Sequence, residues 1–223
     1  MNNLIPTVVV WRGSCWFCSG HSPIKYLGDP LNVVKVLSDF GVDEIAVMNT
    51  DDHISDIIFE MPKYVNRPIS MTGAISCFET AEKLIEAGFD RVGFTDPHIR
   101  KSPVLGQVIE HFGASSAVVN VRALPHELVD VTQRIIKRFP ASEYIFHDVE
   151  RAGTLRGLQQ DFDCLALKFN GVNIAVSGGY NGGASPPMTR VYYSARCVFP
   201  LRKTPFDFSE DAVPTDFILV PSG

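Results

Sequence analysis

The feature that most limits the fold is a regular alternation between short apolar runs and segments of helical period. Eight runs rich in valine and isoleucine are predicted to form strands, and they cover residues 4–10, 44–48, 69–71, 91–94, 117–121, 144–147, 173–176 and 191–195. Parallel neighbours need helical crossovers between them, so this order predicts a parallel sheet. Eight such units indicate an α/β fold, a (β/α)₈ TIM barrel that is shortened or irregular in its last two units.

Helix boundaries carry local signals in several places. Asp29-Pro30 predicts a helix start, with the aspartate as N-cap and proline in the first turn. The run Ser76-Cys77-Phe78-Glu79 predicts a capping box for a second helix. A further helix is expected to begin after Ser102-Pro103 and to end at Gly113. These signals fall between predicted strands, as a barrel requires.

The chain is expected to form a single domain. Its 223 residues suffice for one barrel with a large core. We divide it into a first half-barrel (1–113), a second half-barrel (114–199) and an irregular tail (200–223) that carries four prolines. An internal echo supports the halves, since Thr72-Gly73-Ala74 and Ser177-Gly178-Gly179 end strands that lie four units apart.

Composition excludes several functional classes. The formal net charge is −5 and predicts no basic face, which argues against nucleic-acid binding. No apolar run approaches the roughly 18–20 residues of a membrane span, and the N-terminus lacks the pattern of a signal peptide. Five cysteines are an odd number without a disulfide framework, so reduced thiols and a cytoplasmic location are expected.

Glycines at the predicted strand ends point to an anion site. In such barrels the chemistry lies on the loops that follow the strands. Glycine lets backbone N–H groups approach an anion, and the following helix N-terminus favours negative charge. Gly73, Gly153-Thr154 and Gly178-Gly179 all occupy such positions. One glycine pair alone is more often only a tight turn, but three at equivalent positions favour phosphate.

Several motifs occur in a fixed order along the chain. Gly28-Asp29-Pro30 through Asp43-Glu44 is similar to G-D-P…G-x-D-E, Arg151-Ala152-Gly153-Thr154 to R-D-G-T, and Val176 to Gly179 to A-S-G-G. Residues 74–92 are similar to G-G-I-x-x-F-E-T-A…G-A-D-K-V. In this order they resemble the HisA/HisF family of histidine-biosynthesis barrels, and most of all the cyclase subunit of imidazole glycerol phosphate synthase. The resemblance runs from residue 4 to about 181 and fades afterwards.

The resemblance implies a barrel of the ribulose-phosphate-binding type and a ligand with a phosphate at each end. Gly73 would serve one phosphate, and the glycines of the second half-barrel the other. The full set of predicted phosphate-binding residues is Gly73, Ala74, Thr95, Gly153, Thr154, Ser177, Gly178, Gly179, Arg196 and Cys197.

The catalytic positions depart from the family. The resemblance implies two aspartates as general acid and base, but an ungapped reading places Val9 and Arg122 there. Valine cannot transfer a proton, and arginine stays protonated at physiological pH. Asp148 and Asp96 are the best replacements on the same face, although Asp148 can instead orient a neighbouring arginine and Asp96 cap a turn. Arg122 would suit a ligand phosphate or carboxylate.

The residues at the opposite end of the barrel differ less from the family pattern. The resemblance implies a glutaminase partner that delivers ammonia through a charged gate at the N-terminal face. Glu44, Arg91 and Glu143 fit three gate positions, while Asn3 replaces an arginine, and Asp90 fits a partner-contacting acid. The alternative interpretation is that these are ordinary solvated charges at strand entrances.

The cysteines give only a weak metal signal. Cys15, Cys18 and His21 share one predicted loop, and such residues suit zinc. A C-x-x-C without its second pair is weak support, and cysteines are often simply buried. No metal and no cofactor are therefore predicted.

The leading prediction is a HisF-like subunit that binds a phosphorylated small molecule. It would use ammonia from a glutaminase, in histidine biosynthesis or a related nitrogen-inserting pathway. One alternative is a catalytically silent barrel that binds ligand or glutaminase as a regulator or scaffold. Another is a metal-dependent lyase or isomerase on the same fold. Whether the chain is an enzyme stays open at this stage.

Overall fold

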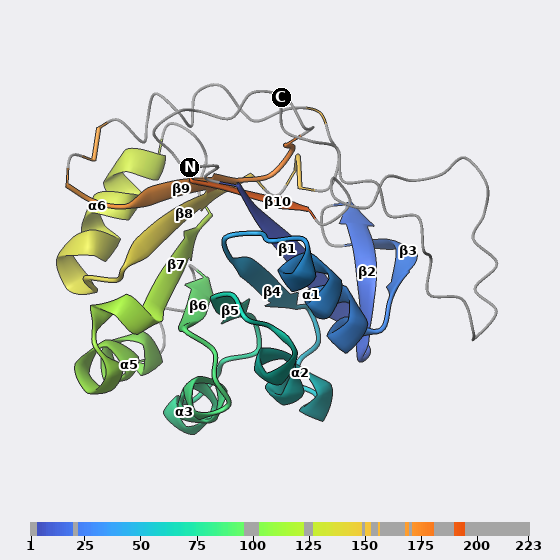
Figure 1. The fold of residues 1–223 in the computed structure, drawn as a ribbon. Helices are drawn as coiled ribbons and strands as arrows, with labels where there is room; N and C mark the ends of the chain where they lie inside the picture. The colour runs from blue at the N-terminus through green and yellow to red at the C-terminus, as the bar shows by residue number, and fades with distance from the viewer. Residues whose placement is uncertain are drawn as a thin grey trace.

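The protein is a closed barrel of eight parallel strands. A computed structural model describes residues 4–19, 22–95, 103–122, 127–148, 150–152, 156, 168–169, 171–180 and 190–194. The barrel strands are β1 (Leu4–Trp11), β4 (Ile45–Asn49), β5 (Ile69–Thr72), β6 (Arg91–Thr95), β7 (Ala117–Val121), β8 (Glu143–His147), β9 (Ile174–Ser177) and β10 (Arg190–Ser194). Each pairs in parallel with the next, and β10 pairs with β1, so the ring closes (Figure 1). The predicted TIM barrel is thus confirmed.

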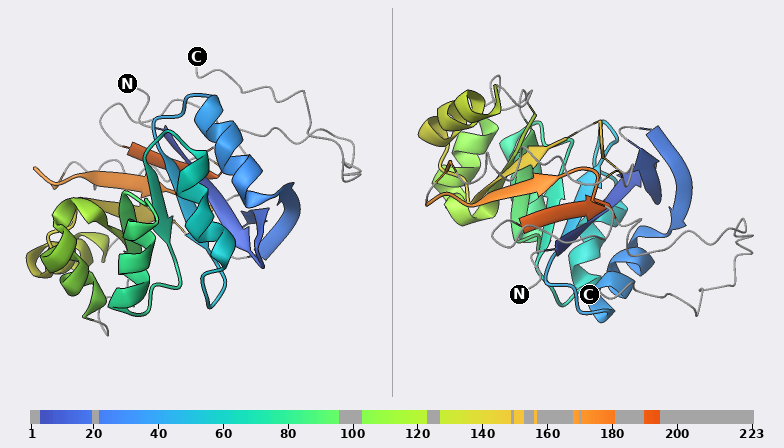
Figure 2. Two further views of the ribbon diagram at one scale, coloured as in Figure 1. Left: turned by 60° about the horizontal axis from the view of Figure 1, so that its bottom comes forward. Right: turned by 90° about the horizontal axis from the view of Figure 1, so that it is seen from above.

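Helices lie on the outside of this ring (Figures 1 and 2). Those described are α1 (Pro30–Asp39), α2 (Asp56–Glu60), α3 (Phe78–Glu86), α5 (Val104–Phe112) and α6 (Leu128–Arg138), with short 3₁₀ turns η1 (Met61–Tyr64) and η2 (Ala114–Ser116). None of these helices has the length and apolar character that a membrane crossing demands. The predicted tail (200–223) falls outside the described residues.

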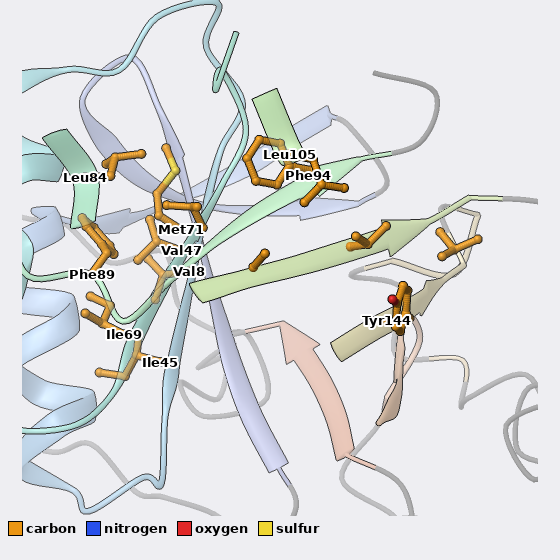
Figure 3. Packing of buried hydrophobic residues seen from close by; sticks show 14 of the residues in the cluster. Val8, Ile45, Val47, Ile69, Met71, Leu84, Phe89, Phe94, Leu105 and Tyr144 are labelled. Carbon is orange, nitrogen blue, oxygen red and sulfur yellow. The ribbon is translucent and has the colours of Figure 1, made fainter. Parts of the chain in front are cut away.

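Two apolar layers follow from the alternation of side chains along each strand. The outer layer packs strand residues such as Val8, Val47 and Met71 against helix residues such as Leu84 (Figure 3). The inner layer fills the barrel axis and consists of Ile5, Ala46, Val118, Ile145, Ala175 and Tyr192. Side chains therefore occupy most of the axis below the mouth of the barrel and leave only a small cavity of about 20 Å³ among them.

A β-hairpin extends the first strand, where the sequence predicted only a loop. β2 (Ser14–Ser19) pairs antiparallel with the end of β1 and with β3 (Ser22–Gly28). Arg12 and Gly13 form the two-residue turn between β1 and β2, with φ values of 50° and 69°. Both central residues of a type I′ turn need such positive φ values and are usually Asn, Asp or Gly. Because an arginine holds the first of these positions, the sequence gives no sign of the turn.

The helix starts show one confirmed prediction and one error. The Asp29 side chain accepts the N–H groups of Leu31 and Asn32 at 3.0 and 3.1 Å, as expected of an N-cap. The capping box from Ser76 to Glu79 is wrong. The helix starts one residue later than predicted, so Cys77 is the N-cap and Glu79 falls at the second helical position instead of the third. The Cys77 side chain makes no capping hydrogen bond.

Candidate functional site

The two halves of the barrel present matching strand ends at the C-terminal mouth. On β4 and β5, Met48 lies beside Thr72, and on β8 and β9, His147 lies beside Ser177. The strand order makes β4 and β5 of the first half equivalent to β8 and β9 of the second. Thr72 and Ser177 are each followed by one of the predicted anion-binding turns.

These two turns share an unusual backbone conformation. Gly73 and Ala74 have φ values of 104° and 56°, and Gly178 and Gly179 have 108° and 85°. At both places two successive residues have positive φ, so the same backbone pattern occurs twice. Ala74 adopts a conformation that costs a residue with a Cβ roughly 1–2 kcal/mol.

Close backbone approach explains the first glycine of each turn. A Cβ on Gly73 would lie 2.0 Å from the carbonyl oxygen of Asn49, and one on Gly178 would lie 2.4 Å from that of Asp148. Each carbonyl belongs to the segment that ends the neighbouring strand. Glycine is therefore required by the barrel itself at both positions, in addition to any role in binding an anion.

A cavity of about 60 Å³ lies at the mouth beside the second turn. Its lining comes from β1, β2, β4, β9, β10 and the ends of β8, and it includes the predicted residues Ser177, Gly178 and Gly179. Gly73 and Ala74 do not line it. A smaller cavity of about 20 Å³ shares Ser177 with it and is lined also by Thr72, directly before the first turn.

The other predicted phosphate residues are placed only in part. Thr95 ends β6, the strand that follows the first turn. Gly153, Thr154, Arg196 and Cys197 fall outside the described residues.

The structure places the acid–base candidates of the sequence only in part. Val9 lines the larger cavity, as expected for an inward position of β1. The Asp148 carboxylate accepts the Arg151 N–H at 3.1 Å and lies 3.4 Å from that guanidinium, and it does not line the cavity. Asp96 falls outside the described residues. His147 does line the cavity, and its Nδ1 lies 3.1 Å from Ser177 Oγ.

His147 was not selected from the sequence, although one signal was available. It is the last residue of a predicted strand, and inward-facing positions at strand ends supply the chemistry of such barrels. A histidine can exchange protons near neutral pH, which valine and arginine cannot.

At the opposite end of the barrel, four charged side chains form a closed quartet. Arg91 pairs with both Glu44 and Glu143, the latter at 3.1 Å, and Arg190 pairs with the same two glutamates, reaching Glu143 at 3.0 Å. We call these four residues the quartet. Its formal charges cancel, and the glutamate side chains are 9% and 1% exposed. The predicted gate residues Glu44, Arg91 and Glu143 therefore do meet.

Tyr192 lies directly above the quartet. Its hydroxyl donates to Glu143 and accepts from Arg91 at 3.1 Å. Burial raises the pKa of Tyr192 well above its ordinary value, and the charge of Glu143 adds to this effect. Burial alone would lower the pKa of Arg91, but Tyr192, Glu44 and Glu143 outweigh it and raise that pKa. Arg91 therefore keeps its positive charge over the physiological range.

The quartet has the two-fold pattern of the barrel. In the sheet register, Arg91 of β6 lies beside Ser70 of β5, and Ser70 is two residues before the strand end at Thr72. In the same way, Arg190 of β10 lies beside Ala175 of β9, which is two residues before the strand end at Ser177. Arg190 is thus the equivalent of Arg91 in the other half-barrel. Arg190 was not predicted from the sequence, although the repeat of the two half-barrels offers a signal for it.

The remaining predicted gate residue has a local role in the structure. Asp90 is exposed, and its carboxylate accepts the Ile69 N–H at 2.8 Å at the start of β5. Asn3 falls outside the described residues.

The cysteines of the hairpin lie in separate environments. Cys15 belongs to the outer apolar layer, whereas Cys18 lines the cavity at the mouth. Burial raises the pKa of Cys18 to about 11 and that of Cys15 still further. Within the described ranges, no three His, Cys, Asp or Glu side chains come together as metal ligands. His21 falls outside those ranges.

Comparison with known proteins matches these features to one group. A family model described as "Histidine biosynthesis protein" matches residues 3–184. The imidazole glycerol phosphate synthase subunit HisF of a Nostoc species is 28% identical over 106 residues, which are 45% of this chain and 41% of that protein. A putative subunit hisF3 of Vibrio vulnificus is 23% identical over 161 residues, 61% of this chain and 62% of its own. A Thermotoga HisF is 22% identical over 174 residues, which are 68% of this chain and 69% of that protein. The chain thus matches less than half the length of the first of these relatives.

Proposed function

The chain belongs to the histidine biosynthesis protein family, and from this premise we propose that it is a HisF-like subunit that binds a phosphorylated small molecule and receives ammonia from a glutaminase. The observation that carries the ligand half is the repeated turn, Gly73-Ala74 and Gly178-Gly179, at equivalent strand ends. A molecule with a phosphate at each end would contact both turns and span the mouth between them.

The quartet supports the ammonia half of the proposal. It lies across the N-terminal end of the barrel, and all four of its charges are paired. Above it lies the apolar inner layer, which disfavours a charged ammonium ion far more than neutral ammonia. Arg190 has a side chain that is 33% exposed, against 11% for Arg91. A partner that docks at this end would therefore reach Arg190 first and could open the quartet by moving it.

The reaction proposed here is a nitrogen insertion other than the usual cyclisation. Val9 and Arg122 occupy the positions where the sequence resemblance implies aspartates, and neither can act as a general base. His147 lines the mouth cavity together with Cys18 and three tyrosines, and we propose its imidazole as the proton-transfer group. Asp148 and Asp96 remain proposals for the same role, with the Asp148 carboxylate already held by Arg151.

A catalytically silent barrel is the second candidate. It is favoured by the same two substitutions, and it would retain the quartet as a docking end. The two candidates differ in one respect. A working subunit needs His147, whereas a scaffold tolerates His147→Gln without loss of function in the cell.

Two measurements test the leading proposal. Titration with inorganic phosphate, followed by backbone amide NMR, should shift the resonances of Gly73-Ala74 and Gly178-Gly179 together. Co-expression with a HisH-type glutaminase should give a complex that Arg190→Glu disrupts. Asp52→Lys, an exposed change at the opposite end of the barrel, serves as the control and should leave the complex intact. Amides that stay in place and a glutaminase that does not bind would contradict the proposal.

A further inference from the structure

We infer that Arg122 binds an additional oxyanion of the substrate, a carboxylate or phosphate group, at the mouth of the barrel. The inference deepens the proposed function, because it takes the C-terminal mouth as the ligand site and adds a contact beyond the two glycine turns. It thereby specifies the substrate class as one with an anionic group near the barrel axis.

The arginines on the strands of the barrel provide the contrast that carries this inference. Arg91 and Arg190 each contact two glutamates in the quartet. Arg122, directly after β7, has a buried Nε with no hydrogen-bond partner, and no carboxylate pairs with it in the part of the chain that the structure describes. A partly buried cation without a partner costs free energy that a bound anion would recover.

The pKa values agree with this contrast. Burial lowers the pKa of Arg122, and no neighbouring charge opposes the effect. In Arg190, burial acts in the same direction, but Glu143, Tyr192 and Glu44 outweigh it and raise the pKa. A guanidinium remains protonated in proteins even after such a decrease, so Arg122 presents a positive charge that no carboxylate among the described residues pairs with.

The register places Arg122 next to His147, which lines the cavity at the mouth, although Arg122 itself is not among the residues that line either of the two cavities. Val121 of β7 lies beside Phe146 of β8, and the residues that directly follow these two in the sequence are Arg122 and His147. Asn120, two residues before Arg122, lines the smaller cavity inside the barrel. Alternation along the chain therefore puts Arg122 on the inward side, next to the His147 that lines the larger cavity.

The chemistry of the guanidinium decides the ligand class. Its planar fork of N–H donors matches the two oxygens of a carboxylate or phosphate. The glycine turns offer backbone groups for the terminal phosphates, so the group at Arg122 is a separate one. A protein carboxylate at this position would repel such a group, and the aspartate-to-arginine difference therefore changes which substrates can bind.

Arg122→Met provides a test with two readouts in the full-length protein. Removing an unpaired buried charge should raise the melting temperature in the absence of ligand, since the apolar side chain needs no partner. The same change should weaken the binding of inorganic phosphate or of acetate, in separate titrations, by about tenfold or more. The titration in which binding is weakened, with phosphate or with acetate, shows which kind of oxyanion Arg122 binds. A lower melting temperature with unchanged anion binding would overturn the inference.

NMR of the arginine Nε–H groups separates this inference from the proposed function. A saturable shift of the Arg122 signal, with the Arg91 signal unchanged, supports the inference. Shifts at Gly73 and Gly178 without a shift at Arg122 overturn it and leave the proposed function standing. If neither the turns nor Arg122 respond to either anion, both proposals fail.

Discussion

At the scale of single residues, charge is handled in two opposite ways in this barrel. In the quartet every buried charge faces two of opposite sign, while Arg122 at the other end has a buried Nε and no partner within the described part of the chain. Burial of a charge is tolerated when the partner is present and costs free energy when it is absent. The first arrangement satisfies its own charges, and the second is the one at which we propose a bound anion.

Arg91→Met tests the quartet as a structural unit. Removal of one partner leaves Glu44 and Glu143 short of positive charge inside the barrel, so the free energy of unfolding should fall by about 3–5 kcal/mol. Lys63→Met is the matched control, since Lys63 pairs with Glu60 at 2.8 Å on the exposed surface. Such a surface pair contributes about 1 kcal/mol or less. Urea denaturation of both variants measures the difference, and equal losses would contradict the role given to Arg91.

Cys18 predicts a pH dependence at the same scale. Its pKa is raised to about 11 by burial, from an ordinary value of 9.0. Below pH 9 the thiol is protonated in both states. Between pH 9 and 11 only the unfolded chain loses the proton, so the free energy of unfolding should fall as pH rises through this window. Cys18→Ala should reduce that fall, and Cys77→Ala, at a partly exposed thiol, is the control. An identical alkaline slope in wild type and Cys18→Ala would rule out this linkage.

At the scale of elements, the strand-end turns depend on the absence of a side chain. Gly73→Ala places a Cβ 2.0 Å from the Asn49 carbonyl oxygen and also strains a backbone with φ of 104°. Gly171 is the control, because its φ is 78° but nothing lies within 4 Å of its Cβ position. Gly171→Ala should cost only the conformational strain of about 1–2 kcal/mol. Gly73→Ala should cost at least about 2 kcal/mol more, by thermal or chemical unfolding, as a steric clash in a packed region does.

The elements also show where local sequence signals suffice. Asp29 begins α1 as predicted, because an N-cap is decided by one side chain and the two N–H groups beside it. The start of α3 was misplaced by one residue, since several neighbouring residues satisfied the same pattern and packing chose among them. The β1–β2 hairpin was missed because its turn uses Arg12, a residue that gives no turn signal in the sequence.

At the scale of the whole molecule, the closed ring brings β10 next to β1 and completes the quartet with Arg190. Closure also aligns the two glycine turns at one end and the quartet at the other. The turns and the quartet therefore lie at opposite ends of one axis, and these are the proposed ligand end and the proposed docking end. This separation is what the proposed transfer of ammonia along the axis requires.

Complementation tests the proposed change of reaction at this scale. The chain should fail to restore growth of a histidine auxotroph that lacks the cyclase subunit, because Val9 and Arg122 cannot supply the acid and base. The Thermotoga HisF relative, expressed from the same vector, is the positive control. Growth supported by this chain would show that the cyclisation survives without the two aspartates.

The sequence alone determined the fold class, most strand positions and the family, because these depend on hydrophobic periodicity and on the order of short motifs along the chain. It also identified Gly73 and Gly178-Gly179, since positive φ leaves a local preference for glycine. Only the tertiary structure decided which charges meet. Glu44 and Arg190 are 146 residues apart along the chain, and their pairing exists because the barrel closes. The same holds for His147 and for the unpaired Nε of Arg122, since a partner can be counted as present or missing only after distant strands have been brought together.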